Sequence, residues 1–92
     1  MVIYKYEFPI TDSFTLDLPV GAKVLTAFVQ AENPQWVRDR KACLWAEVNP
    51  DIIMESRKFS IVGTGNPMPH GIKRWIASFP DGQFVWHLYE MK

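Results

Sequence analysis

The chain has little of the chemistry that small proteins use for covalent or metal cross-links. Its 92 residues contain one cysteine, Cys43, so they cannot form an intramolecular disulfide or a zinc site made of thiolates alone. The two histidines, His70 and His87, stand outside any paired ligand motif such as His-x-x-x-His. We therefore expect no metal site and no cofactor.

The chain also lacks an excess of either charge. Ten Lys and Arg balance ten Asp and Glu, so the chain as a whole exerts no long-range attraction on nucleic acid. It contains neither a signal-peptide pattern nor an apolar run long enough to span a membrane. These absences predict a soluble protein of the cytoplasm, folded as one small domain over residues 1–92.

What the chain does have is alternation of apolar and polar residues over short runs, which is typical of β-strands. Seven such runs are bounded by turn-forming residues and cover positions 2–8, 14–18, 23–30, 42–49, 57–63, 73–79 and 84–90. The second run has one apolar and one polar face, and it predicts a strand at or near a sheet edge.

The turn residues between these runs indicate how they connect. Pro80, Asp81 and Gly82 predict a hairpin that pairs the last two runs antiparallel. The only plausible helical piece covers residues 49–56, where Asn49 could cap and Pro50 could occupy the first helical position, and it could make one or two turns at most. We therefore predict an all-β fold, either a small antiparallel sandwich or a partly open barrel of about six to seven strands, with at most one short helical turn.

The stretch FSIVGTGNPMPHG at residues 59–71 raises the question of a phosphate-binding glycine loop. The third glycine of a dinucleotide fingerprint is replaced by Met68, and Pro67 and Pro69 prevent a helix from starting where the phosphate would lie. Gly63 and Gly65 instead predict a bulge or bend that ends a strand and lets another backbone approach closely. The loop is then a rigid connector, or a platform that displays three side chains to a partner, namely Asn66, Met68 and His70.

Four segments, LPVGAKVL, LWAEVNP, RKFSIVGTGNP and FVWH, occur in order along most of the chain. In these segments the chain resembles a family of small uncharacterised proteins of bacteriophages and of bacteria that carry phage-derived genes. The resemblance implies a phage or prophage setting inside a bacterial host cell. It assigns no catalytic residue, because the family has no known activity. Residues 32–41 depart from the family pattern as a longer loop, which could hold a specificity of its own.

That loop is the strongest candidate for partner binding. Trp36 stands close to three cations, Arg38, Arg40 and Lys41, and the basic pairs at 57–58 and 73–74 could extend the patch. Aromatic and arginine side chains together are enriched at protein interfaces, and a Trp among cations can also stack on a base beside phosphates. A solvated loop is the third interpretation.

The sequence gives less support to a catalytic function. Cys43 could act with His70 or His87, but it lies in an apolar strand and is better interpreted as a buried, inert thiol. No spacing indicates a serine triad, and His87 is expected to be a hydrogen-bonded structural histidine. Paired carboxylates that could share acid and base work are also missing.

We therefore expect a non-enzymatic module that binds a protein. Binding of nucleic acid through Trp36–Lys41 is the first alternative, and an enzyme with a site near His70 and His87 is the second. Thirteen aromatic residues are many for a small core, and four of them fall in strands whose two faces are both partly apolar, namely Tyr4, Tyr6, Trp75 and Tyr89. Either a nearly closed barrel packs these bulky side chains, or one strand face or edge meets another subunit. We favour the second interpretation, and hence a homo-oligomer.

Overall fold

The computed structural model describes residues 1–31 and 40–92. Its described residues form seven strands in chain order, and two antiparallel sheets arise from them. The strands are β1 (Val2–Phe8), β2 (Ser13–Pro19), β3 (Lys23–Ala31), β4 (Arg40–Val48), β5 (Met54–Gly63), β6 (Lys73–Asp81) and β7 (Phe84–Met91). This confirms the all-β prediction.

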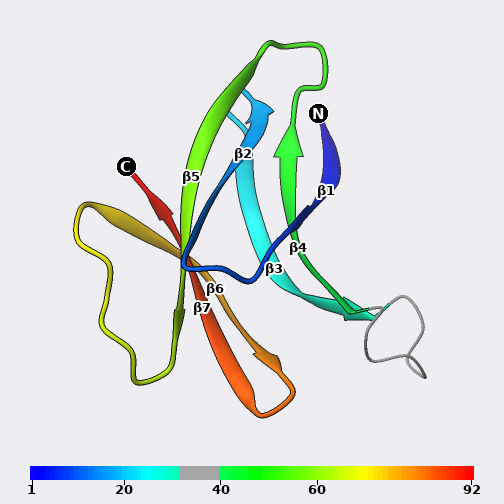
Figure 1. Ribbon diagram of the computed structural model, residues 1–92. Helices are drawn as coiled ribbons and strands as arrows, with labels where there is room; N and C mark the ends of the chain where they lie inside the picture. The colour runs from blue at the N-terminus through cyan, green and yellow to red at the C-terminus, as the bar shows by residue number, and fades with distance from the viewer. Residues whose placement is uncertain (32–39) are drawn as a thin grey trace.

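The two sheets have three and four strands. The first has the order β1-β4-β3 and the second the order β2-β5-β7-β6, as Figure 1 shows. β3 of the first sheet packs against β6 of the second, so these two edges cover each other. The expected hairpin between β6 and β7 is present, with Gly82 at a φ of 60° in its turn, and β2 is an edge strand as predicted.

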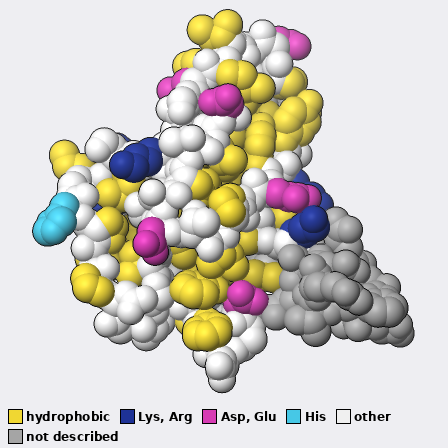
Figure 2. Space-filling model, in the orientation of Figure 1, with side chains coloured by type: hydrophobic (Ala, Val, Ile, Leu, Met, Phe, Trp, Pro, Cys, Tyr) yellow, Lys and Arg dark blue, Asp and Glu magenta, His cyan; other side chains and the backbone are white. Residues whose placement is uncertain are grey.

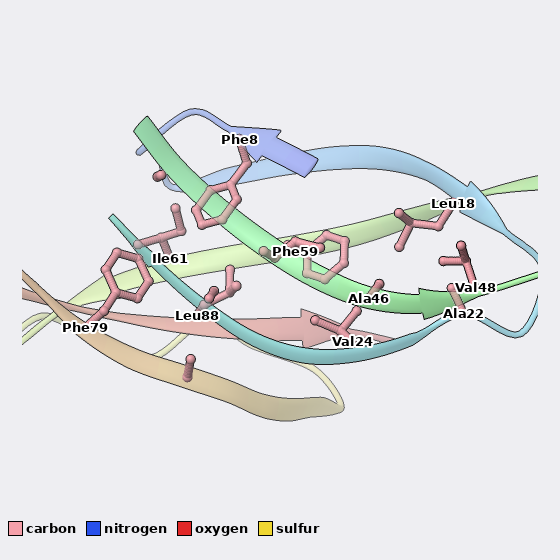
Figure 3. Packing of buried hydrophobic residues seen from close by; sticks show 14 residues of the cluster. Phe8, Leu18, Ala22, Val24, Ala46, Val48, Phe59, Ile61, Phe79 and Leu88 are labelled. Atoms are coloured by element: carbon pink, nitrogen blue, oxygen red, sulfur yellow. The ribbon is translucent and has the colours of Figure 1, made fainter. Parts of the chain in front are cut away.

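The core lies between the sheets and takes side chains from both. Phe8 of β1, Phe14 of β2 and Phe59 of β5 stack in series, with ring centroids 4.9 and 5.3 Å apart. Figure 3 shows Phe8, Phe59 and Phe79 in the space between strands of the two sheets. Alternate residues of each strand supply this layer, which is why a period of two marked the strands in the sequence.

The helical turn that the sequence allows at residues 49–56 does not form. Asn49 instead closes a tight turn in which its Oδ1 accepts a hydrogen bond from the backbone N–H of Asp51 (3.1 Å). The chain is extended again by Ile53, whose carbonyl accepts from the N–H of Val20 (2.9 Å), and β5 begins at Met54. Pairing with β2 satisfies these backbone groups, whereas an isolated turn of helix carries the cost of nucleation without the bonds that offset it.

Candidate interaction surface

The outer face of the four-stranded sheet carries a row of polar and aromatic side chains centred on His87. The strand register places His87 between Val62 of β5 and Ser78 of β6. One row further along the same face, Tyr89 lies opposite Trp75. Three strands, β5 and the hairpin partners β6 and β7, therefore contribute neighbouring side chains to one surface.

A β-bulge in β6 brings Trp75 and Ser78 to the same face. Residues three apart in a regular strand point to opposite faces, but the register shifts between Trp75 and Ala77, which leaves Ile76 as an extra residue. The indole Nε1 of Trp75 consequently donates a hydrogen bond to Ser78 Oγ over 3.0 Å. Nothing in the local sequence marks this bulge, so the pair escaped prediction.

The hydrogen bonds around His87 join both of its ring nitrogens to hydroxyl groups. Thr64 Oγ1 lies 2.8 Å from His87 Nε2 and donates to the carbonyl of Val85 (3.3 Å). On the other side, Ser78 Oγ accepts from the indole N–H of Trp75 and lies 2.7 Å from His87 Nδ1. His87 is thus hydrogen-bonded on both sides, as expected from its strand position.

The loop after β5 adds a shallow pocket to this face. A hollow of about 230 Å³ lies between the loop and the sheet, and its lining includes Asn66 and Met68 together with His87 and Tyr89. Met68 is 47% exposed at its rim. We call the residues Trp75, Ser78, His87, Tyr89, Asn66 and Met68 the Trp75 surface.

A second, larger hollow lies against the other side of the same loop. It has a volume of about 510 Å³, and Pro67, Pro69 and Trp86 are among its lining residues. Asn66 lines both hollows. The loop therefore lines two hollows, and its paired prolines restrict the backbone that forms it.

The two glycines at the start of this loop differ in role. Gly65 has a φ of 91°, which is the bend that the sequence predicts. Gly63 ends β5, and the three atoms nearest to a Cβ built there belong to the side chains of Asn66 and Trp86. A Cβ at position 63 would lie 2.9 Å from Asn66 Nδ2 and 3.2 Å from Trp86 Cζ3. Only a hydrogen at Gly63 leaves room for both.

The other residues that the sequence predicts to bind a partner do not belong to the Trp75 surface. His70 is exposed, and no hydrogen bond or ion pair in the described part of the chain joins it to His87. Lys41 lies on β4 of the three-stranded sheet, with Nζ 4.0 Å from the carboxylate of Glu7. Trp36 and Arg38 fall outside the described residues, and of Arg40 only its place as the first residue of β4 is described.

The basic pairs at 57–58 and 73–74 are each divided between the two faces of the sheet. Arg57 and Arg74 both bind the carboxylate of Glu90, at 2.6 and 3.3 Å. Lys58 and Lys73 belong to the outer face, where both lie opposite Met91. The sequence pairs therefore do not form one continuous basic patch, because Arg57 and Arg74 lie on the other face of the sheet and share the carboxylate of Glu90.

The described residues contain few groups that could serve as a reactive thiol or a metal site. Cys43 is buried in β4, as predicted. Outside positions 32–39, no three His, Cys, Asp or Glu side chains gather to hold a metal ion. The described residues also contain no helix that could cross a membrane.

Comparison with known proteins identifies the chain at the level of family. The profile of a domain of unknown function, DUF7352, matches residues 1–92, the whole chain. The chain belongs to this family. No curated protein and no solved structure shows a significant match to this DUF7352 chain.

Proposed function

We propose that this DUF7352 protein is a non-enzymatic module that binds another protein through the Trp75 surface. From the resemblance alone, we place its action in the cytoplasm of a bacterial cell, in a phage or prophage setting. The partner is a host or phage protein with an apolar projection that fits beside Trp75.

This proposal rests on how the exposed side chain of Trp75 is held in place by hydrogen bonds. Its side chain is 58% exposed, yet its indole N–H is held by Ser78, which His87 holds in turn. Ordering a side chain on binding costs free energy, and a side chain already held in place avoids part of that cost. Exposed Trp, Tyr and Met side chains are enriched at protein interfaces, and Tyr89 and Met68 lie on the same surface.

Two features of the network support binding over catalysis. Ser78 and His87 lie at the distance of a nucleophile and its base, but Ser78 Oγ already accepts the Trp75 N–H. The group that orients His87 on its far side is the hydroxyl of Thr64, where an activated serine needs a carboxylate. An enzyme with a site near His70 and His87 remains the weaker alternative.

The test is affinity capture of the tagged protein from bacterial lysate, before and after nuclease treatment. We expect a specific protein to be retained after nuclease, and Trp75→Ala to remove it. Phe84→Ala is the matched control, because Phe84 is 54% exposed and stacks on Trp86, on the opposite face of β7 from His87 and Tyr89. Loss of the partner in the control alone, or in neither variant, contradicts the proposed surface.

The same experiment tests the loop at residues 36–41. Our sequence-based prediction is that replacing Trp36 and Arg38 with Ala abolishes partner binding and leaves the fold intact. Comparing this double variant with Trp75→Ala separates the two surfaces. Retention of the partner by the double variant excludes the loop, while loss in both means that the partner contacts both regions.

Nucleic acid is the second candidate, because Lys58 and Lys73 share the outer face with Tyr89 and Trp75. Aromatic side chains on a sheet can stack on bases while cations meet phosphates. Against this, Lys73 Nζ already donates to the carbonyl of Gly71 (2.8 Å). On the face that Figure 2 draws, the Lys and Arg side chains lie at its two sides and form no continuous stripe. Affinity for single-stranded DNA or RNA that falls steeply with salt would favour this candidate.

A further inference from the structure

Strand β1 leaves one of its edges open. It is the end strand of the three-stranded sheet and pairs with β4 on one side only, as Figure 1 shows. Along residues 1–31 and 40–92, no strand pairs with its other side. The backbone N–H and C=O groups along such an edge are free to pair with another strand.

The first half of β1 is also apolar on both faces. Val2 and Tyr4 lie opposite the buried Val48 and Ala46 of β4, yet they are 42% and 45% exposed themselves. Ile3 points to the other face and is 59% exposed. A long edge strand with apolar side chains on both faces is a site of association between chains.

We propose that β1 pairs antiparallel with β1 of a second copy of this chain, about a two-fold axis at Tyr6, so that Tyr6 of one copy lies opposite Tyr6 of the other. The two three-stranded sheets then form one sheet of six strands. In this register Lys5 lies opposite Glu7 of the second copy, and Glu7 lies opposite Lys5 of the second copy. Tyr4 lies opposite Phe8 of the second copy, which adds an aromatic pair on the other face.

Charge complementarity selects this register. An axis through Lys5 would place two lysines face to face, and an axis through Glu7 would do the same with two glutamates, which destabilises a ladder. An axis through Tyr4 would place Lys5 opposite the apolar Ile3. Only the axis through Tyr6 joins opposite charges twice. Lys5 and Glu7 are both exposed and share the outer face of their sheet, Lys5 donating to Gln30 Oε1 over 3.1 Å.

This dimer goes beyond the proposed binding function because it uses a different surface. β1 belongs to the three-stranded sheet, whereas Trp75 belongs to the four-stranded sheet. A dimer joined through β1 therefore carries two copies of the Trp75 surface. A partner with two matching sites would then bind with greater avidity than a monomer allows.

The test is the molar mass of the full chain in solution, measured by light scattering and by sedimentation equilibrium over a range of concentrations. We expect a dimer that dissociates on dilution. Lys5→Glu and Glu7→Lys should each weaken the dimer about tenfold or more, because each turns two attractive pairs into two repulsive ones. The double variant with both changes restores opposite charges at each pair, so it should recover the affinity of the original chain.

Lys58→Glu is the matched control, since it reverses an exposed charge on a strand of the other sheet. Circular dichroism of each variant shows whether its fold is retained. A chain that is monomeric at all concentrations overturns the proposal, whether or not β1 binds a foreign strand instead. A dimer that the single reversals leave unchanged, or that the double variant fails to restore, overturns it as well.

Discussion

Arg57 and Glu90 form a two-point ion pair at the inner face of the four-stranded sheet. Arg57 Nε and Nη2 donate to the two carboxylate oxygens of Glu90 at 2.6 and 2.8 Å, and both side chains are largely buried. Arg57 also donates to the carbonyl of Ala22, next to the start of β3 in the other sheet. This side chain therefore links the two sheets at one end of the core.

The ion pair makes the stability of the fold depend on pH. The hydrogen bond from Arg57 holds the pKa of Glu90 below its ordinary value of 4.5, although burial acts in the opposite direction. Near and below pH 4.5 the unfolded chain therefore binds more protons than the folded chain. The pair stabilises the fold above pH 4.5, and this contribution is lost as the pH falls below that value.

We expect urea denaturation to show this loss between neutral pH and pH about 3, and Glu90→Gln to remove it while lowering stability at pH 7 by about 2–3 kcal/mol. The matched control is Lys41→Gln, which breaks an exposed pair and should cost under about 1 kcal/mol. An equal dependence on pH in Glu90→Gln and the original chain would contradict the assignment.

Ser78→Ala should release the Trp75 side chain. The change leaves the indole N–H of Trp75 and Nδ1 of His87 without their partner, at a cost of about 1 kcal/mol. The indole N–H resonance of Trp75 in a nitrogen–proton NMR spectrum should shift and exchange faster with solvent. Ser56→Ala, at another exposed strand position, should leave that resonance in place. An unchanged resonance in Ser78→Ala would rule out the hydrogen bond in solution.

Gly63→Ala should destabilise the protein through contact with Trp86. The added Cβ would lie 3.2 Å from Trp86 Cζ3, and overpacking of this kind costs about 1–3 kcal/mol. Trp86→Phe removes that atom, so Gly63→Ala should cost less in the Trp86→Phe background. Chemical denaturation of the two single variants and the double variant measures the coupling. Strict additivity of the two changes would show that the contact is absent.

Cys43 should react with a thiol reagent only when the chain unfolds. Its side chain is fully buried in β4, so the reagent has no access to the thiol in the folded state. Reaction with a chromogenic disulfide should therefore be slow in buffer and fast in denaturant. Fast reaction in buffer would contradict the burial of Cys43.

The Trp75 surface shows where prediction from the sequence stops. The sequence places Asn66 and Met68 on a loop that is either a rigid connector or a platform for a partner, and both line the pocket beside His87. Trp75 and Ser78 were not assigned to it, because their positions three apart indicate opposite faces of a strand. The extra residue Ile76 changes that relation, and its place depends on how β6 and β7 align.

The sequence by itself determined the strands, the turn at Gly82 and the burial of Cys43. These follow from local chemistry, since alternation marks a half-buried strand and particular residues suit particular turns. Only the tertiary structure decided that β5, β6 and β7 bring Thr64, Ser78 and His87 into contact. It also decided that residues 49–53 form a turn and no helix, because the chain pairs with β2 immediately afterwards. Register and pairing depend on contacts between distant segments, which no local pattern records.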